Sequence, residues 1–132
     1  MNREIEYRAW HKEDKKMLHV CGIDWMINLE DDCVDIGVVR CAERRSDGWV
    51  NGGSHDIDNV ILMQYTGIKD KNGVKIFEGD VINVSVFSVG ASEVKYVNSA
   101  FRLYPHANTI GGFFSKELEV IGNIHEDKEL SS

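Results

Sequence analysis

Two groups of side chains in this sequence could bind a metal ion. Carboxylate oxygens are ligands for Mg²⁺ and Ca²⁺, and imidazole combined with carboxylate suits a transition metal. The acidic group lacks the D-x-D-x-D-G order of a calcium loop, and the histidine group has no second histidine at ligand spacing. Polar turns explain both groups better, so we expect no metal and no cofactor. The groups are Glu30, Asp31, Asp32 and Asp35, and His55, Asp56 and Asp58.

Catalytic side chains find little support in the sequence. The cysteines Cys21, Cys33 and Cys41 form no C-x-x-C pair, and a cysteine on a predicted strand is by default an inert buried thiol. No G-x-S-x-G, P-loop, strand-linked G-x-G-x-x-G or H-E-x-x-H pattern occurs. Glu78 and Asp80 could act as an acid–base pair, but the glycine between them favours a role in a turn. We therefore expect no enzymatic activity.

Aromatic residues could instead form a binding surface, as they do on the faces of many small barrels. Stacking on single-stranded nucleic acid would also require interleaved basic side chains, and only Lys95 and Arg102 meet that condition. We predict a candidate binding face made of Lys95, Tyr96, Phe101 and Arg102. The alternative is that the rings fill the β cores, because aromatic side chains bury a large area. The aromatic residues considered are Trp10, Trp25, Trp49, Tyr96, Phe101 and Tyr104.

Composition indicates one globular domain in a reducing compartment. Of the 132 residues, 42% are hydrophobic and 28% are charged, as in an ordinary soluble domain. The formal charge of −7 disfavours nonspecific nucleic-acid binding, which depends on Lys and Arg neutralising phosphates. The polar N-terminus indicates no signal peptide, and the longest stretch without Asp, Glu, Lys, Arg or His, residues 81–92, is shorter than the roughly 18 residues that a membrane span needs. Free thiols fit a reducing cytoplasm.

The periodicity of the sequence favours an all-β fold. Apolar and polar residues alternate along most of the chain, which is typical of half-buried strands. Glycines and polar residues predict a loop over residues 46–53, and Ser115 is a candidate N-cap for a short helical turn at 115–118. The predicted strands lie in residues 4–10, 17–20, 23–29, 34–39, 60–65, 74–76, 81–86, 94–97, 101–104 and 118–124.

Residues 62–84 carry the clearest turn chemistry. The pair Asn72–Gly73 predicts a type I′ hairpin turn, which needs positive φ at both central residues. In the triplet from Glu78 to Asp80, Gly79 can adopt a left-handed conformation without a Cβ clash, and Asp80 can accept backbone N–H groups. The uncharged strand that follows, residues 81–86, must be interior or paired across a subunit interface, because nothing protects it as an edge. We therefore predict a homo-oligomer, in its simplest form a dimer.

Four blocks of the sequence resemble the YopX family of bacteriophage and prophage proteins. The blocks read EYRAWHKEDKKMLHV, QYTGIKDKNG, IFEGDVI and EVIGNI, in this order along the chain. The resemblance implies a single YopX-like domain over residues 1–132. It further implies an SH3-type small β-barrel at residues 61–130, with an N-terminal β-hairpin region at residues 1–60 packed on it. It supplies no catalytic residues.

Three functions follow as hypotheses. The first is a noncatalytic phage or prophage module that binds a protein partner or assembles with itself. The second is a nucleic-acid-binding barrel in phage replication or regulation, which requires Lys95, Arg102 and the lysines at 69, 71 and 75 to converge on one face. The third is a metal-dependent hydrolase that uses the two groups of potential ligands described above.

Overall fold

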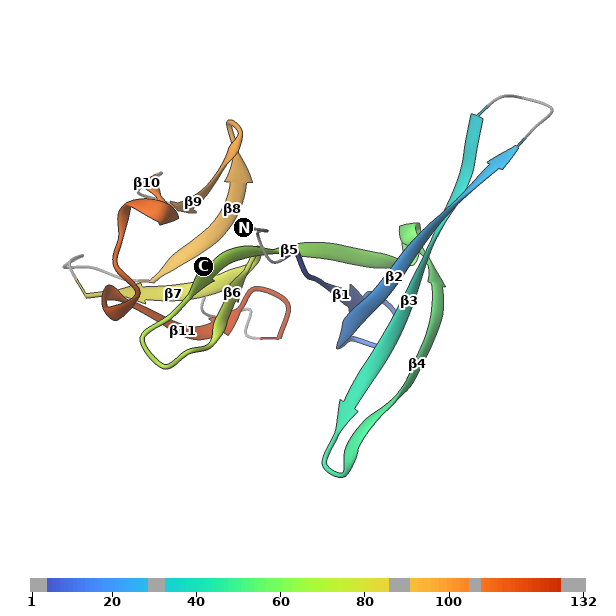
Figure 1. Ribbon diagram of the computed structural model, residues 1–132, viewed down its shortest axis with the longest axis horizontal. Helices are drawn as coiled ribbons and strands as arrows, with labels where there is room; N and C mark the ends of the chain where they lie inside the picture. Colours follow the sequence, from blue (N-terminus) through green and yellow to red (C-terminus); the bar gives the residue numbers. More distant parts are fainter. Residues whose placement is uncertain (1–4, 29–32, 86–90, 105–107, 127–132) are drawn as a thin grey trace. The chain divides into compact units, whose positions relative to one another are not determined.

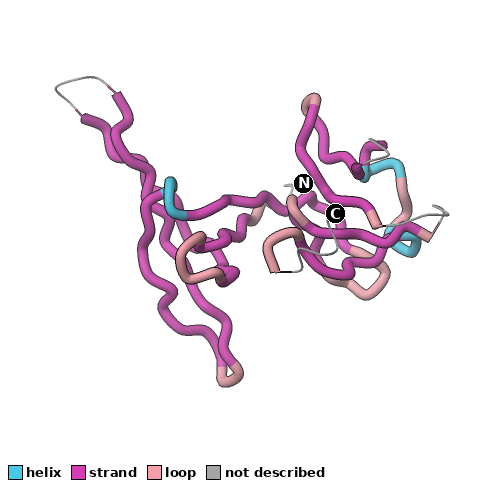
Figure 2. Tube along the Cα trace, turned by 180° about the vertical axis from the view of Figure 1, so that it is seen from behind, coloured by secondary structure: helices cyan, strands magenta, loops and turns pink. Residues whose placement is uncertain are grey.

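Strands make up most of the protein, and the all-β prediction is confirmed (Figure 2). The computed structural model describes residues 5–28, 33–85, 91–104 and 108–126. Within these ranges the helical segments are three short 3₁₀ turns, η1 (Ile57–Asn59), η2 (Ile110–Gly112) and η3 (Ser115–Glu117). None of the described helices is long and apolar enough to cross a membrane. The chain divides into two units, one of residues Glu6–Leu62 and one of Met1–Ile5 with Met63–Ser132.

The first unit, Glu6–Leu62, is an antiparallel sheet in the order β4-β3-β2-β1-β5. A polar turn with positive φ at Lys15 joins β1 (Tyr7–His11) to β2 (Lys16–Asn28). Figure 1 shows β2 and β3 (Cys33–Arg45) running side by side as the longest pair of strands. Strand β4 (Gly48–Asp56) returns along β3, and β5 (Val60–Lys69) begins in this unit and continues into the other.

One face of this sheet forms the core of the unit. Side chains alternate between the two faces of a strand, so paired residues on neighbouring strands point to the same side. Ala9 pairs with Leu18, and Val20 pairs with Cys41. The buried members of this cluster are Ala9, Leu18, Val39, Cys41 and Val60. The residues between them in β1–β4 therefore lie on the opposite face.

The predicted loop over residues 46–53 is wrong beyond its first two residues. Only Ser46–Asp47 forms a turn, and the glycine pair lies inside strand β4. Gly52 is the extra residue of a β-bulge between the pairs Cys41↔Gly53 and Ala42↔Asn51. A Cβ on Gly52 would lie 3.1 Å from the carbonyl carbons of Cys41 and Ala42, so glycine lets the bulge approach β3. The glycine pair marks a bulge within a strand here, not a loop.

The second unit contains an antiparallel sheet in the order β10-β9-β8-β7-β11. Strand β6 (Lys75–Phe77) pairs with the later part of β5. The sheet comprises β7 (Asp80–Val84), β8 (Ser92–Val97), β9 (Ala100–Tyr104), β10 (Asn108–Thr109) and β11 (Leu118–Asn123). Its core is a cluster of branched aliphatic side chains, namely Ile76, Ile82, Val84, Val94, Leu103, Ile110 and Leu118.

Strand β7 is interior to this sheet. It pairs with β11 on one side and with β8 on the other, and Val81, Ile82 and Val84 are buried. Neighbouring strands therefore satisfy the backbone of this uncharged strand. Of the two outcomes predicted for it, the interior position is the one observed, and β7 gives no reason for a subunit interface.

The turn at Asn72–Gly73 is not of type I′, because Gly73 has a φ of +81° but Asn72 does not have a positive φ. The N–H of Gly73 donates to the carbonyl of Asp70 at 3.0 Å, which closes a turn over residues 70–73. Oδ1 of Asp70 accepts the N–H groups of Asn72 and Val74 at 2.8 and 2.9 Å. These bonds favour a turn built around Asp70, with Gly73 as its left-handed residue.

Positive φ at two successive residues occurs instead at Asn98 and Ser99, with values of +52° and +64°. They form the two-residue loop between β8 and β9, in the gap between the strands predicted at residues 94–97 and 101–104. The N-cap expected at Ser115 is displaced by one residue, because Ser115 is the first residue of η3 and Phe114 precedes it as the cap. The N–H of Phe114 donates to Oε1 of Glu117, so the acceptor comes from the end of the turn.

Gly79 has the left-handed conformation that the sequence predicts, with a φ of +84°. Its N–H donates to the carbonyl of Val94 and its carbonyl accepts the N–H of Ile124, both at 2.9 Å. A Cβ at this position would lie 3.1 Å from Sδ of Met63. We expect Gly79→Ala to lower the free energy of unfolding by about 1–2 kcal/mol, measured by urea denaturation, because alanine disfavours this φ and meets the thioether.

Gly73→Ala is the matched control for this substitution. Its φ of +81° is nearly the same, but a Cβ there meets nothing within 4 Å. We expect a loss of about 1 kcal/mol from conformation alone. An unchanged denaturation midpoint for Gly79→Ala would show that the turn tolerates a side chain.

Candidate binding surfaces

The acidic side chains of the central motif hold backbone groups. Oε1 of Glu78 accepts the N–H of Gln64 at 2.9 Å, and Oδ2 of Asp80 accepts the N–H of Phe77 at 2.8 Å. Asp80 is buried. Because both carboxylates accept bonds that fix the turn to β5 and β6, this geometry favours a structural role over an acid–base pair.

The sequence's metal candidates are only partly described. Glu30, Asp31 and Asp32, and the side chain of Asp35, lie outside the described residues. In the described part of the chain, no group of three His, Cys, Asp or Glu side chains is arranged to hold a metal ion. His55 lies beside His11, a neighbour from β1 that spacing along the chain does not reveal.

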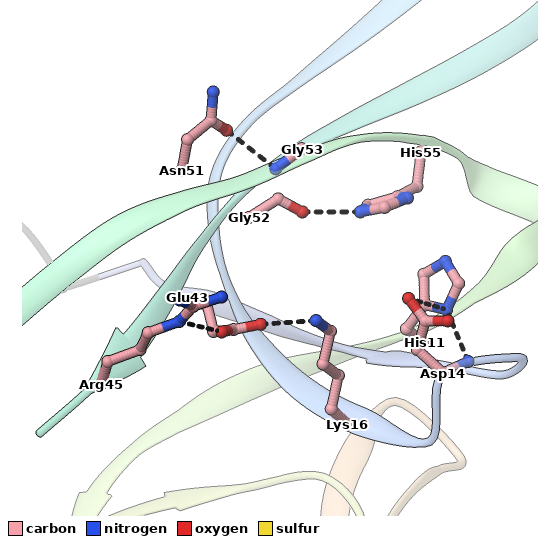
Figure 3. Close-up of polar contacts among 9 residues, drawn as sticks. All are labelled: His11, Asp14, Lys16, Glu43, Arg45, Asn51, Gly52, Gly53 and His55. Atoms are coloured by element: carbon pink, nitrogen blue, oxygen red, sulfur yellow. Dashed lines mark hydrogen bonds and ion pairs between the residues drawn. The ribbon is translucent and has the colours of Figure 1, made fainter.

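This histidine pair, drawn in Figure 3, lies on the core side of the first sheet, because His55 pairs with the core residue Val39 and His11 is two residues from the core residue Ala9. The two rings are 4.5 Å apart between centroids and nearly perpendicular. Nδ1 of the buried His11 accepts the N–H of Asp14 at 3.0 Å, and Nε2 of His55 is 2.8 Å from the carbonyl of Gly52. Since one nitrogen of each ring is engaged by the backbone, the pair closes the turn after β1 and supports the bulge in β4.

Glu43 on β3 joins two cations on the same side of the sheet (Figure 3). Its carboxylate oxygens lie 2.6 Å from Nζ of Lys16 and 2.6 Å from Nε of Arg45. The hydrogen bonds from Lys16 and then Arg45 hold the pKa of Glu43 below its ordinary value. Glu43 therefore stays ionised and ties β2 to the end of β3.

Cys41 fits the prediction of an inert buried thiol. Cys41 is buried, and burial, followed by the nearby Cys21, raises the pKa of its thiol. A thiol with a raised pKa is a poor nucleophile at neutral pH. The side chain of Cys33 lies outside the described residues, and Cys21 is exposed.

The four residues of the candidate binding face do not share one face of their sheet. The register pairs Tyr96 with Phe101 and Lys95 with Arg102, and these pairs point to opposite sides because side chains alternate. The rings of Tyr96 and Phe101 contact each other at 5.0 Å, and Phe101 packs against the core. On the other side, Nζ of Lys95 lies 5.2 Å from the ring of Tyr104, and Nε of Arg102 donates to the carbonyl of Val97.

A different surface combines aromatic and basic residues on one side. This surface, the Trp49 face, is one part of the side of the β1–β4 sheet opposite its core. The same side also carries Asp24 and Asp56, which both pair with Val38 farther along the sheet. Two rows of paired residues make up the Trp49 face, and none of its side chains is buried. Its eight positions are Arg8, Trp10, Met17, His19, Ala42, Arg44, Trp49 and Asn51.

Trp49 is the most prominent residue of this face, with 57% of its surface exposed. The guanidinium carbon of Arg44 lies 5.5 Å from the centroid of the indole. The ring of His19 lies 5.4 Å away, tilted by 55°. Arg44 and Trp49 are directly opposite each other on β3 and β4, so strand pairing creates this arrangement.

The sequence does not predict this face, because the glycines and polar residues at 46–53 favour a loop. A loop has no alternation, so Trp49 and Asn51 could not be placed on a side. The available signal was the alternation from Ala42 to Arg44, which continues the strand predicted from residue 34. Extending that strand would have required a partner strand beyond the turn at Ser46–Asp47.

Comparisons with known proteins agree with this fold. A crystal structure of protein EF1440 from Enterococcus faecalis matches with a TM-score of 0.67 and 23% identity, over 99% of this chain and 100% of that one. A crystal structure of protein yopX from Bacillus subtilis matches with a TM-score of 0.54 and 21% identity, over 95% of this chain and 96% of that one. No curated protein matches the sequence.

The family model described as YopX protein matches residues 6–131. The match covers both units, including residues 21–61, which lie between the first two of the four sequence blocks. The chain therefore belongs to the YopX family.

Proposed function

We propose that this protein is a noncatalytic binding module, encoded by a phage or prophage and acting in the cytoplasm of the bacterial host. The observation that carries the proposal is the Trp49 face, where an exposed indole is held in place by Arg44 and His19. Trp and Arg are enriched at the centres of protein–protein interfaces, and here they lie side by side on an exposed surface. Its partner is a protein, as the sequence favours.

The roles of the described ionisable groups support a noncatalytic module. Glu78 and Asp80 accept backbone N–H groups, and Glu43 is bound by two cations. The Cys41 thiol is buried. Groups held in this way stabilise turns and strand pairs, whereas a catalytic group must reach a substrate.

Affinity capture from host cells tests the proposal. The tagged protein, expressed in a bacterium that carries the phage or prophage, should elute with a protein partner at a fixed ratio. Size-exclusion chromatography of the eluate should show a complex that survives dilution. A preparation that contains the tagged chain alone, under several salt conditions, would contradict a role in protein binding.

Nucleic-acid binding remains the first alternative. It would require Lys95, Arg102 and the lysines at 69, 71 and 75 on one face. Several of these cations are already engaged. Lys95 lies over Tyr104 and Lys75 over Tyr65, while Nζ of Lys71 lies 3.6 Å from Glu119. These contacts weaken the electrostatic case for this alternative.

A metal-dependent hydrolase is the second alternative, and no geometry of the described residues favours it over binding.

The finer fold prediction, an SH3-type barrel over residues 61–130, also belongs to this proposal. Its support is the antiparallel order β10-β9-β8-β7-β11 around a single core. An experimental structure in which the first and last strands pair would establish closure.

Self-association is a further part of the proposal, although β7 no longer argues for it. Sedimentation equilibrium over a wide concentration range should reveal a dimer if the predicted homo-oligomer forms. A monomeric mass at all concentrations would remove self-association and leave a different protein as the partner.

A further inference from the structure

The amino-acid composition of the Trp49 face matches that of the central, energetically dominant part of a protein–protein interface. Trp, Met and Arg are enriched at such centres, and Asp and Glu are depleted. The face contains Trp10, Trp49, Met17 and Arg44, and none of its eight positions is acidic. This departs from the chain as a whole, which has 22 acidic and 15 basic residues.

The Trp49 side chain is positioned before any partner arrives. Arg44 stacks on the indole at 5.5 Å, and His19 contacts it at 5.4 Å. A ring that is already ordered loses little conformational entropy when it binds. Trp49 is therefore suited to insert as an anchor into a pocket of a partner.

The charge of the face identifies the kind of partner. Two identical copies related by a twofold axis through Trp49 would bring Arg44 of one copy toward Arg44 of the other, and none of the eight positions offers a carboxylate to offset this. Of the two carboxylates farther along the same side, Asp24 already pairs with Arg40 at 2.9 Å. A surface that carries carboxylates around an apolar pocket would instead complement Arg44 and Trp49 together.

Stacked nucleobases fit less well. Arg44 already covers the indole at a distance typical of cation–π contact, and a base would have to displace it to stack there. A partner protein needs only the exposed edge of the ring and the outer side of the guanidinium.

We propose that the Trp49 face binds an acidic surface of a different protein, with the Trp49 indole in an apolar pocket and Arg44 facing carboxylates. This inference rests on the proposed binding function and specifies its site and the chemistry of its partner.

The first experiment measures binding of a random copolymer of glutamate and tyrosine, which supplies carboxylates and apolar rings. At low salt, fluorescence anisotropy of the labelled copolymer should show saturable binding to the full-length protein. Trp49→Ala and Arg44→Glu should each weaken binding by about tenfold or more, as truncation of an interface centre does.

Trp25→Ala is the matched control. Trp25 is 58% exposed, almost the same as Trp49, but it pairs with Gly37 on the opposite side of the same sheet. Its variant should bind the copolymer within about twofold of the parent, because it leaves the Trp49 face intact. Circular dichroism of each variant checks that the sheet is still formed.

Several outcomes would overturn the proposal. They are no copolymer binding by the parent protein, equal losses in Trp25→Ala and Trp49→Ala, or tighter binding of an oligothymidylate that the same substitutions remove. A dimer of the parent protein that Trp49→Ala dissociates would assign the face to a second copy.

The captured complex separates this inference from the broader one. If a partner is captured equally well by the parent and by Trp49→Ala, the protein is a binding module but the face is wrong. If no partner is captured at all, the proposed function itself fails. Loss of the captured partner in Trp49→Ala and Arg44→Glu, with retention in Trp25→Ala, supports both.

Discussion

Replacing Asp70 with alanine should lower the free energy of unfolding by about 3 kcal/mol or more, because a buried acceptor of several backbone N–H groups is lost. Asp70 is only 3% exposed. Its carboxylate accepts the N–H groups of Asn72, Val74 and Val120 at 2.8, 2.9 and 2.9 Å. Alanine would leave all three donors without this acceptor and would detach the turn from β11. Urea denaturation of parent and variant measures the difference.

The same carboxylate makes stability depend on pH. Burial tends to raise the pKa of Asp70, but the hydrogen bonds from Val120, Val74 and Asn72 outweigh it, so the pKa is lowered. A lowered folded-state pKa means that the stabilisation is complete above the unfolded value of about 3.9 and is lost as pH falls through the folded value. As the pH is lowered below about 4, the free energy of unfolding of the parent should therefore decrease more than that of Asp70→Ala, which lacks this carboxylate.

Lys71→Ala is the control for Asp70→Ala. Its side chain is exposed and lies 3.6 Å from Glu119, so its removal should change stability by less than about 1 kcal/mol. Equal effects at positions 70 and 71 would show that the carboxylate network contributes little.

Substitutions in the two cores should act mainly on their own unit. Ile82→Ala in the second unit and Leu18→Ala in the first should each cost about 3 kcal/mol, because both side chains are almost fully buried and alanine leaves a cavity. The two clusters share no residue. Hydrogen exchange should show Ile82→Ala reducing the protection of β7, β8 and β11, and Leu18→Ala that of β1, β2 and β3.

Ile121→Ala is the control that makes the same change of residue type at an exposed position. Ile121 belongs to the second unit and is 41% exposed, so its truncation should cost well under half as much, roughly 1 kcal/mol. If either core substitution instead lowered protection by the same amount in every strand, the two units would unfold as one cooperative block.

The sequence predicted most strands because the period-two pattern depends only on which side of a strand faces a core. Residues 60–65, 94–97 and 118–124 fall in β5, β8 and β11 almost as expected. The left-handed conformation of Gly79 was also predictable, since the Glu-Gly-Asp triplet favours such a residue at its centre. The observed φ is +84°. Turn type was less accessible. The Asn-Gly pair suggested type I′, but the buried Asp70 carboxylate selects a different turn.

What the sequence determined by itself was an all-β chain of the YopX type, because strand periodicity and the family's motifs are both local in the sequence. Only the tertiary structure decided which residues share a surface. The register of β8 and β9 separates Lys95 and Arg102 from Tyr96 and Phe101, whereas the register of β3 and β4 brings Arg44 onto Trp49. Register depends on turn geometry and on bulges such as that at Gly52, and a shift by one residue moves every side chain to the other face.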